Sequence, residues 1–288
     1  MLTDELKKKL VIFQNNEITE AVIYEKLAAV VRDENNKSVL KKIAADEKKH
    51  YHNLKKLSRV EVGVNKWKVW KFYLLSRVLG LTFGIKLMEN AEERAQEAYA
   101  SVYDVIPELK LIKEEEEAHE KALIDMLNED RLKYVGSVVL GLNDALVELT
   151  GALAGFTLAL QEPKLVATAG FITGIAASFS MAASEYLSTK SEQTDKSPIR
   201  ASLYTGLAYI FTVLFLIFPY LVLANPIASL GWTLCHATII ILFFTFYTAI
   251  AMDLPFRKRF AEMIGISFSV AGFSFIVGFF VKKFIGLE

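Results

Sequence analysis

Residues 135–160, VGSVVLGLNDALVELTGALAGFTLAL, form an apolar stretch that contains two acidic residues. It is long enough to cross a membrane as a helix, because about 20 residues at a 1.5 Å rise span a hydrocarbon core of about 30 Å. Asp144 and Glu148 are four residues apart and therefore share one face of that helix. A carboxylate at this depth costs about 2.5–3.5 kcal/mol, so we expect both to face a bundle interior or a watery path. Carboxylate oxygens in such a place indicate a pathway for cations.

The distribution of charge divides the chain into two parts. Residues 1–134 hold 24 Lys+Arg and 24 Asp+Glu, whereas the remaining residues hold only nine of each. This contrast predicts a soluble domain over residues 1–130 and a membrane domain over residues 131–288. The net charge of zero gives no reason to expect nucleic acid as a partner. Cys235 is the single cysteine, so an intrachain disulfide is excluded.

The apolar half predicts five membrane-spanning helices, near residues 135–160, 164–188, 200–224, 229–252 and 262–281. If the spans alternate, one side of the membrane receives Arg131, Lys133, Lys190, Lys196, Arg200, Arg257, Lys258 and Arg259. The other side receives Lys164, Lys282 and Lys283. An excess of Lys and Arg is typical of cytoplasmic loops. We therefore expect a multi-pass membrane protein with a cytoplasmic N-terminal domain and a C-terminus outside the cell or in a lumen.

The charged half predicts helices only, which makes the fold class all-α. Apolar residues recur at helical spacing, and the breaks fall at residues 33–36, at residues 60–66 and before Pro107. We expect four helices, near residues 4–32, 35–58, 68–103 and 107–130. Four helices of this length suit an antiparallel four-helix bundle.

Two Glu-x-x-His pairs stand in the second and fourth of these predicted helices: Glu47 with His50, and Glu116 with His119. The i, i+3 spacing allows both side chains of a pair to bind one metal ion. In di-iron carboxylate bundles two helices each supply such a pair and the other two each supply one Glu. The candidates are Glu17 and Glu92, each followed seven residues later by a tyrosine. One Glu-x-x-His in so charged a region is usually a solvated face, but the repeated arrangement predicts a di-metal site. Residues 114–117 are otherwise interpreted as a solvated acidic face.

This pattern resembles the ferritin-like superfamily, in particular rubrerythrin-type domains, over about residues 5–130. The resemblance implies a di-iron cofactor bridged by Glu47 and Glu116. It also implies that the remaining ligands of the two iron ions are His50, His119, Glu17 and Glu92, with Glu20 and Glu89 as further ligands. A Cys-x-x-Cys pair is absent from the sequence, and with it the electron-transfer module of full rubrerythrins. The implied activity is therefore oxidation, binding or sensing of iron.

The second predicted span carries Met181 and Glu185 on one helical face. A soft thioether beside hard carboxylates suits Fe²⁺ and related transition metals, although Met181 alone is more simply interpreted as a core side chain. Residues 141–151 and 181–188 are similar to the vacuolar iron transporter family, and the similarity extends over roughly residues 132–285. It implies a homodimer that moves Fe²⁺, and often Mn²⁺, out of the cytoplasm in exchange for protons. It also implies that Asp144 and Met181 line the pathway with Glu148 and Glu185 close by.

The connection between the second and third spans is short, residues 189–199. Plant-type members of that family carry a long metal-gathering insert there, so the N-terminal bundle would have to take over its role. Fusions of this kind resemble membrane-bound ferritins. Two alternatives stay open: a membrane-anchored iron oxidase, and an iron sensor without transport. The acidic residues within the spans favour transport, because an anchor needs neither Asp144 nor Glu148.

Overall fold

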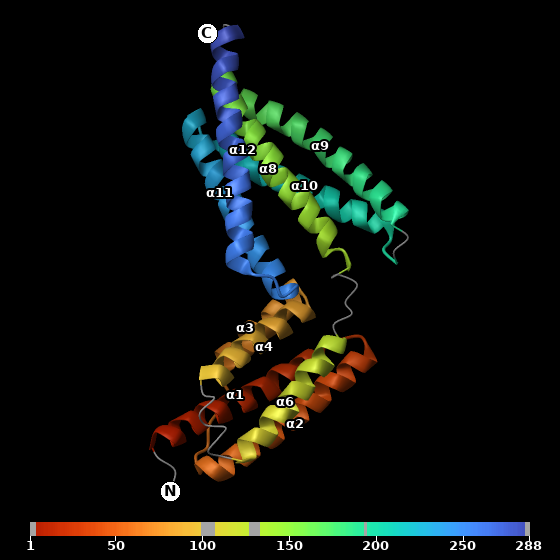
Figure 1. Ribbon diagram of the computed structural model, residues 1–288, viewed down its shortest axis with the longest axis vertical. Coiled ribbons are helices and arrows are strands. Elements are labelled where there is room, and N and C mark those ends of the chain that lie inside the picture. Colours follow the sequence, from red (N-terminus) through yellow and green to blue (C-terminus); the bar gives the residue numbers. More distant parts are fainter. Residues whose placement is uncertain (1–3, 99–106, 127–132, 193–194, 286–288) are drawn as a thin grey trace. The chain divides into compact units, whose positions relative to one another are not determined.

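The computed structural model describes residues 4–98, 107–126, 133–192 and 195–285, and every regular element in these ranges is a helix (Figure 1). This confirms the all-α class. The chain divides into two compact units, Met1–Glu129 and Asp130–Glu288, called unit 1 and unit 2 below.

The described part of unit 1 contains α1 (Asp4–Ala28), α2 (Glu34–Ser58), α3 (Lys66–Leu79), α4 (Leu81–Ala98) and α6 (Pro107–Met126). The prediction of one helix over residues 68–103 is wrong, because α3 and α4 are separate helices that meet at Gly80. Gly80 has a φ of 105°, a conformation that favours glycine and cannot continue a right-handed helix. The two helices lie close together beyond this break, since a Cβ on Gly84 would overlap Ser76.

Polar contacts between α1 and the loop after α2 set the position of α3. The Nε2 group of Gln14 donates to the carbonyl of Val60 at 2.9 Å, and the Oγ1 atom of Thr19 accepts the backbone N–H of Asn65 at 3.0 Å. Asn65 then caps α3 by accepting the backbone N–H of Lys68 at 3.0 Å. The start of α3 is therefore held against the middle of α1.

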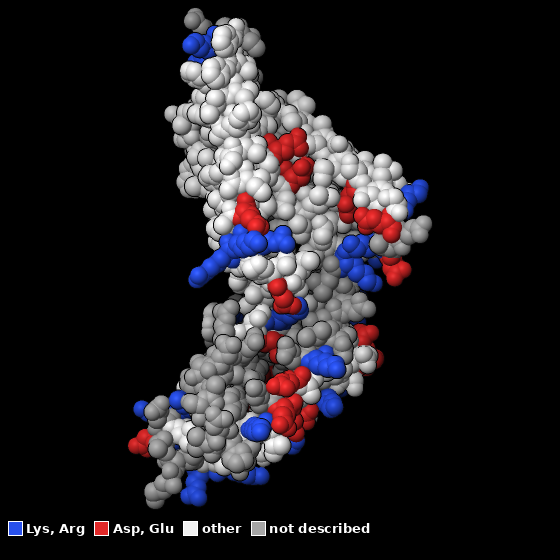
Figure 2. Space-filling view, viewed as in Figure 1, with Lys and Arg blue, Asp and Glu red and all other residues white. Residues whose placement is uncertain are grey.

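Unit 2 contains α8 (Val135–Leu160), α9 (Pro163–Ser191), α10 (Pro198–Val222), α11 (Pro226–Ala251) and α12 (Phe256–Ile285). These are the five membrane-length helices that the hydropathy predicts. Proline occupies the first position of α9, α10 and α11, where its missing N–H costs no helical hydrogen bond. Figure 2 shows that the visible face of this unit is mostly uncharged, with a few acidic and basic patches.

Helix α8 lies at the centre of unit 2 and contacts each of the other four membrane-length helices. Its side chains Ala145, Leu146, Leu149 and Leu153 belong to the main buried cluster. Close approach to two neighbours depends on glycine. A Cβ at Gly141 would overlap the backbone of Thr205 on α10, and one at Gly278 on α12 would overlap the backbone of Gly155 on α8.

Candidate metal centre

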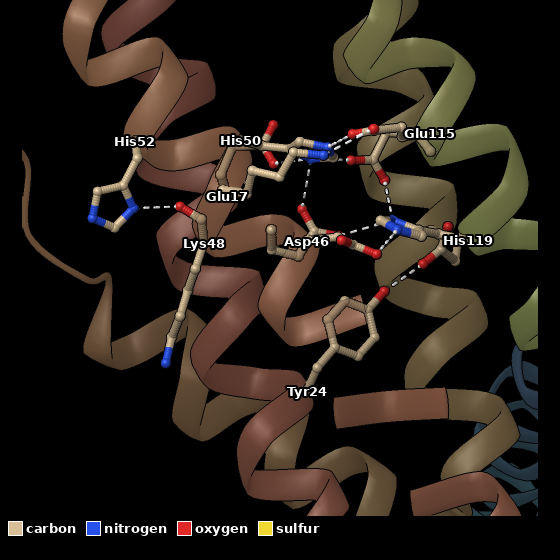
Figure 3. A network of polar contacts seen from close by, with 12 residues as sticks. Glu17, Tyr24, Asp46, Lys48, His50, His52, Glu115 and His119 are labelled. Atoms are coloured by element: carbon tan, nitrogen blue, oxygen red, sulfur yellow. Dashed lines mark hydrogen bonds and ion pairs between the residues drawn. The ribbon is translucent and has the colours of Figure 1, made fainter. Parts of the chain in front are cut away.

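Four acidic and histidine side chains converge inside unit 1: Glu17, Glu47, His50 and Glu116. One ligand atom from each lies within 4.8 Å of the others, and the four come from α1, α2 and α6 (Figure 3). Glu17, Glu47 and His50 are buried. Three carboxylates and an imidazole at this spacing form a donor set suited to a divalent transition metal ion.

Glu47 and Glu116 each face both histidines. The Oε2 atom of Glu47 lies 3.5 Å from Nδ1 of His50, and its Oε1 atom lies 3.4 Å from Nδ1 of His119. Likewise Oε1 of Glu116 lies 3.0 Å from Nδ1 of His50, and its Oε2 atom lies 3.4 Å from Nδ1 of His119. The two imidazole centroids are 5.9 Å apart. Each of these two carboxylates therefore presents one oxygen to each histidine.

The converging atoms have unmet bonding capacity. Oε2 of Glu17, Oε2 of Glu47, Nδ1 of His50 and Oε1 of Glu116 are fully buried and have no hydrogen-bond partner. A buried polar atom without a partner costs about 1–3 kcal/mol, and more when it is charged. The four atoms are contributed by the four residues of the converging group. A bound cation would satisfy all of them together, so the residues fit a metal ion.

The pKa values reflect this crowding of charge. Burial raises the pKa of Glu17 well above its usual range. Burial also opposes ionisation of Glu47, but the neighbouring rings of His119 and His50 outweigh it and lower the pKa of Glu47 to about 2. The pKa of His119 is lowered by burial and raised more strongly by Glu116 and Glu47, to about 10. Without metal, protons on the imidazoles thus balance the carboxylates, and a metal ion would displace those protons.

A second pair of carboxylates contacts the far side of the two imidazole rings. Nε2 of His50 donates to Oε2 of Glu115 at 2.6 Å, and Nε2 of His119 donates to Oδ2 of Asp46 at 3.3 Å (Figure 3). A carboxylate can only accept, so each Nε2 carries a proton in these bonds. Each Nδ1 is then the atom available to a metal, and the ring orientation is held from outside.

Glu115 was not among the predicted site residues. Its side chain is 44% exposed, as a solvated acidic face predicts, but it also contacts His50 and lies 3.0 Å from Nζ of Lys49. Asp46 was likewise missed. A signal for both exists in the sequence, because each stands directly before the Glu of a Glu-x-x-His pair. The contact crosses between helices, from Asp46 on α2 to the histidine of α6 and from Glu115 on α6 to the histidine of α2.

Glu20 and Glu89 are not members of the converging group. Glu20 is buried and lies 2.6 Å from Nζ of Lys68, while Oε1 of Glu89 accepts the hydroxyl of Tyr24 at 2.7 Å. Burial raises the pKa of Glu20 to about 7, against the opposing effect of Lys68. Burial also raises the pKa of Glu89 to about 8. Glu92 lies on α4 but outside the residues whose side chains the structure describes.

The predicted pathway residues lie on two helices of unit 2. Asp144 is half-buried on α8, and Glu148 is exposed there and accepts the hydroxyl of Tyr209 at 3.0 Å. Met181 on α9 is half-buried and packs against the main apolar cluster. The neighbouring Glu185 accepts the hydroxyl of Ser137 at 2.5 Å.

Two of these pathway residues, Glu185 and Glu148, lie at different heights along α8. Ser137, the partner of Glu185, precedes Glu148 on α8 by about 16 Å of helix axis. Among the side chains that the structure describes, those of unit 2 supply no group of three or more His, Cys, Asp or Glu ligands. Asp144 and Glu148 share an outward-facing stripe of α8 with Gly136 and Leu140, both of which are exposed.

Residues 135–197 match the model of the VIT family, the vacuolar iron transporters. The matched segment comprises α8, α9 and the connection to α10, and it contains Asp144, Glu148, Met181 and Glu185. No curated protein and no solved structure matches the chain. Together with the five membrane-length helices, the match indicates a multi-pass membrane protein that transports metal ions, iron or manganese.

Proposed function

We propose that this chain exports Fe²⁺, and Mn²⁺ as a second cargo, from the cytoplasm through unit 2, and that unit 1 is a cytoplasmic ferritin-like helical domain with a di-iron site. One observation carries the proposal: a segment that matches metal transporters and a buried Glu/His cluster with unsatisfied ligand atoms occur in the same chain.

The proposed di-iron site uses Glu47 and Glu116 as bridges, since each turns one oxygen toward each histidine. His50 and Glu17 would hold one ion, and His119 with Glu92 would hold the other. A bound iron pair would supply a change between Fe²⁺ and Fe³⁺, which would allow the domain to sense iron or, with dioxygen as the electron acceptor, to oxidise it. The protein contributes the orientation of both imidazoles through Glu115 and Asp46, and exclusion of water by burial.

The transport pathway requires a second copy of the chain in this proposal. Glu148 is exposed on α8, and an ionised side chain facing lipid is costly at bilayer depth. Pairing the α8 stripes of two copies would cover Asp144 and Glu148 and bring four carboxylates together. Met181 and Glu185 of α9 would extend this pathway along the membrane.

The direction of transport follows from the distribution of basic residues. Their excess on the loops that share a side with unit 1 supports a cytoplasmic unit 1 and a C-terminus on the other side. Metal taken from the cytoplasm would then meet unit 1 first. Carboxylates in a low-dielectric path favour their protonated form, so they can take up protons as the metal leaves. We propose exchange of metal for protons on this basis.

The test is uptake of Fe²⁺ and Mn²⁺ into proteoliposomes that contain the full chain. Wild-type protein is expected to transport both ions and to respond to an imposed pH gradient at fixed voltage. Asp144→Asn is expected to abolish transport, because it removes a carboxylate of the proposed pathway. It is expected to leave folding intact, because the charge that it removes is costly at that depth. Thr168→Val, at an exposed position of α9, is the matched control. Wild-type rates in Asp144→Asn would refute the pathway, and flux indifferent to the pH gradient would refute proton exchange.

A membrane-anchored iron oxidase or iron sensor is the second candidate. One observation favours it: the described Glu/His cluster of unit 1 brings four ligands together within a single chain, whereas the described side chains of unit 2 form no such group. Proteoliposomes that bind and oxidise Fe²⁺ on the outside, with no metal reaching the lumen, would support this candidate and exclude the exporter.

A further inference from the structure

Helix α3 presents two apolar faces, and among the residues that the structure describes only one of them is buried. Val69, Phe72 and Ser76 are buried against the core. On the opposite side, Trp67, Trp70, Leu74 and Val78 follow one another at i, i+3, i+7 and i+11 and form an exposed stripe. Trp67 is 69% exposed, Trp70 54% and Val78 65%, and the two indoles stack at a centroid distance of 5.2 Å.

This exposure is concentrated on α3. Leu79 at the end of α3 is exposed as well, and outside α3 the exposed large hydrophobic side chains among the described residues of unit 1 are Ile12 and Leu111, which stand singly on α1 and α6. Scattered apolar residues are normal on a soluble surface. A contiguous exposed stripe with two tryptophans is unusual on such a surface and indicates a contact surface.

The charges beside the stripe indicate what contacts it. Lys66 and Arg77 border it on one side and Lys71 on the other, and all three are exposed. The sequence of α3, KWKVWKFYLLSRVL, contains no acidic residue. Tryptophan at the headgroup level with Lys and Arg reaching into the aqueous phase is the pattern of a helix that lies in a membrane interface.

The connection to unit 2 keeps unit 1 near a membrane. Residues 127–134 join α6 directly to α8, the first membrane-length helix, so unit 1 is confined near a bilayer surface at high effective concentration. A second copy of α3 is a poorer partner, because a two-fold contact would oppose cations to cations with no acidic residue between them.

We propose that the exposed face of α3 docks unit 1 on the surface of the bilayer that unit 2 spans, with Trp67 and Trp70 at the level of the headgroups and with anionic lipids bound by Lys66, Lys71 and Arg77. Docking of α3 would also fix the position of the metal centre relative to the membrane. Lys68 on the same helix is ion-paired with Glu20, one turn from Glu17 on α1. Docking of α3 therefore holds the converging ligands close to the membrane.

The tryptophan content allows a direct test on the full chain. Trp232 is the only tryptophan besides Trp67 and Trp70, so Trp232→Phe leaves emission from α3 alone. This variant is placed in nanodiscs of phosphatidylcholine and phosphatidylglycerol whose acyl chains are brominated near the headgroup. We expect loss of most of the emission relative to unbrominated nanodiscs. The matched control combines Trp67→Phe, Trp70→Phe and Trp232→Phe with Lys41→Trp at an exposed position of α2, and we expect no quenching there.

A second variant isolates the charges. Lys66→Gln, Lys71→Gln and Arg77→Gln together are expected to weaken docking by about two orders of magnitude, since each cation near an anionic surface contributes about fivefold. Lys68 is left unchanged so that its contact with Glu20 persists, and metal binding and circular dichroism verify the fold. Emission that bromine does not quench in any lipid composition overturns the proposal. So does emission that depends on protein concentration in detergent but not on brominated lipid, because that result assigns the face to a second copy.

Discussion

The Nε2 atom of His50 on α2 lies 2.6 Å from the Oε2 atom of Glu115 on α6, and the reciprocal contact runs from His119 on α6 to Asp46 on α2 at 3.3 Å. Each helix thus supplies one histidine to the metal centre and one carboxylate that orients the histidine of the other helix. These two contacts couple the two Glu-x-x-His pairs, so a change on either helix affects the orientation of both imidazole rings.

The Glu115→Ala variant tests this orientation. Removing the acceptor frees the ring of His50 to rotate and removes the proton acceptor that keeps Nδ1 available, so metal affinity is expected to fall about 10–100-fold. Glu114→Ala, one residue earlier and exposed, is the matched control and is expected to bind as wild type. Competition with a chromophoric chelator measures both. Equal affinities for the two variants would contradict an orienting role.

The Glu47→Ala/Glu116→Ala double variant tests the bridges and the coupling of the two units. Both proposed bridging ligands are lost, so binding of two iron ions per chain is expected to disappear. Transport is then expected to fall at low metal concentration and to recover at high concentration, because unit 1 raises the local metal concentration at the membrane. Metal content and uptake into proteoliposomes are measured together. Retention of two irons would refute the site, and normal transport at every concentration would show that the units work independently.

The Glu89→Gln variant tests the pH dependence of stability in the metal-free protein. The pKa of Glu89 is raised by burial to about 8 in the folded chain, above the ordinary value of 4.5. The stability that the protonated side chain contributes is therefore full below 4.5 and is lost as pH rises toward about 8. Glutamine keeps an acceptor for Tyr24 and does not titrate, so this pH dependence is expected to flatten.

Hydrogen exchange of α1 in the full chain measures this effect between about pH 5 and pH 9, after correction for the intrinsic exchange rates. Glu20, whose pKa is raised to about 7, also makes stability fall as pH rises. Some pH dependence of stability is therefore expected to remain in Glu89→Gln. Glu117→Gln, at an exposed site, is the control and is expected to keep the wild-type slope. A variant at Glu89 that retains the full slope would contradict the assignment.

The Met181→Leu variant separates packing from metal selection. Met181 packs against the apolar cluster of unit 2, and the change nearly conserves volume, so the cost in stability is expected to stay below about 1.5 kcal/mol. Loss of the soft thioether is expected to reduce the preference for Fe²⁺ over Ca²⁺ in uptake. If selectivity and rate both equal those of wild type, Met181 only fills the core.

Contacts within one helix were open to prediction from the sequence. The i, i+3 spacing of Glu47 with His50 and of Glu116 with His119 places each pair on one face, because the helical period is the same in every protein. The five membrane-length helices were predictable for a related reason, since bilayer thickness fixes the length of the apolar run. The start of a helix at Pro163, Pro198 or Pro226 is equally local.

Contacts between helices were decided by the tertiary structure. The bonds from His50 to Glu115 and from Tyr209 to Glu148 depend on how two helices are rotated and offset, which packing of the whole core determines. The apolar periodicity did not predict the break at Gly80, because the periodicity continues through this position. The positive φ of Gly80 is required by the close packing of α3 on α4, which is a tertiary contact. The sequence by itself determined which side chains could serve as ligands and on which helical faces they lie. Their meeting in one buried cluster, with ligand atoms left unsatisfied, required the packed structure, because helix packing alone brings α1, α2 and α6 together.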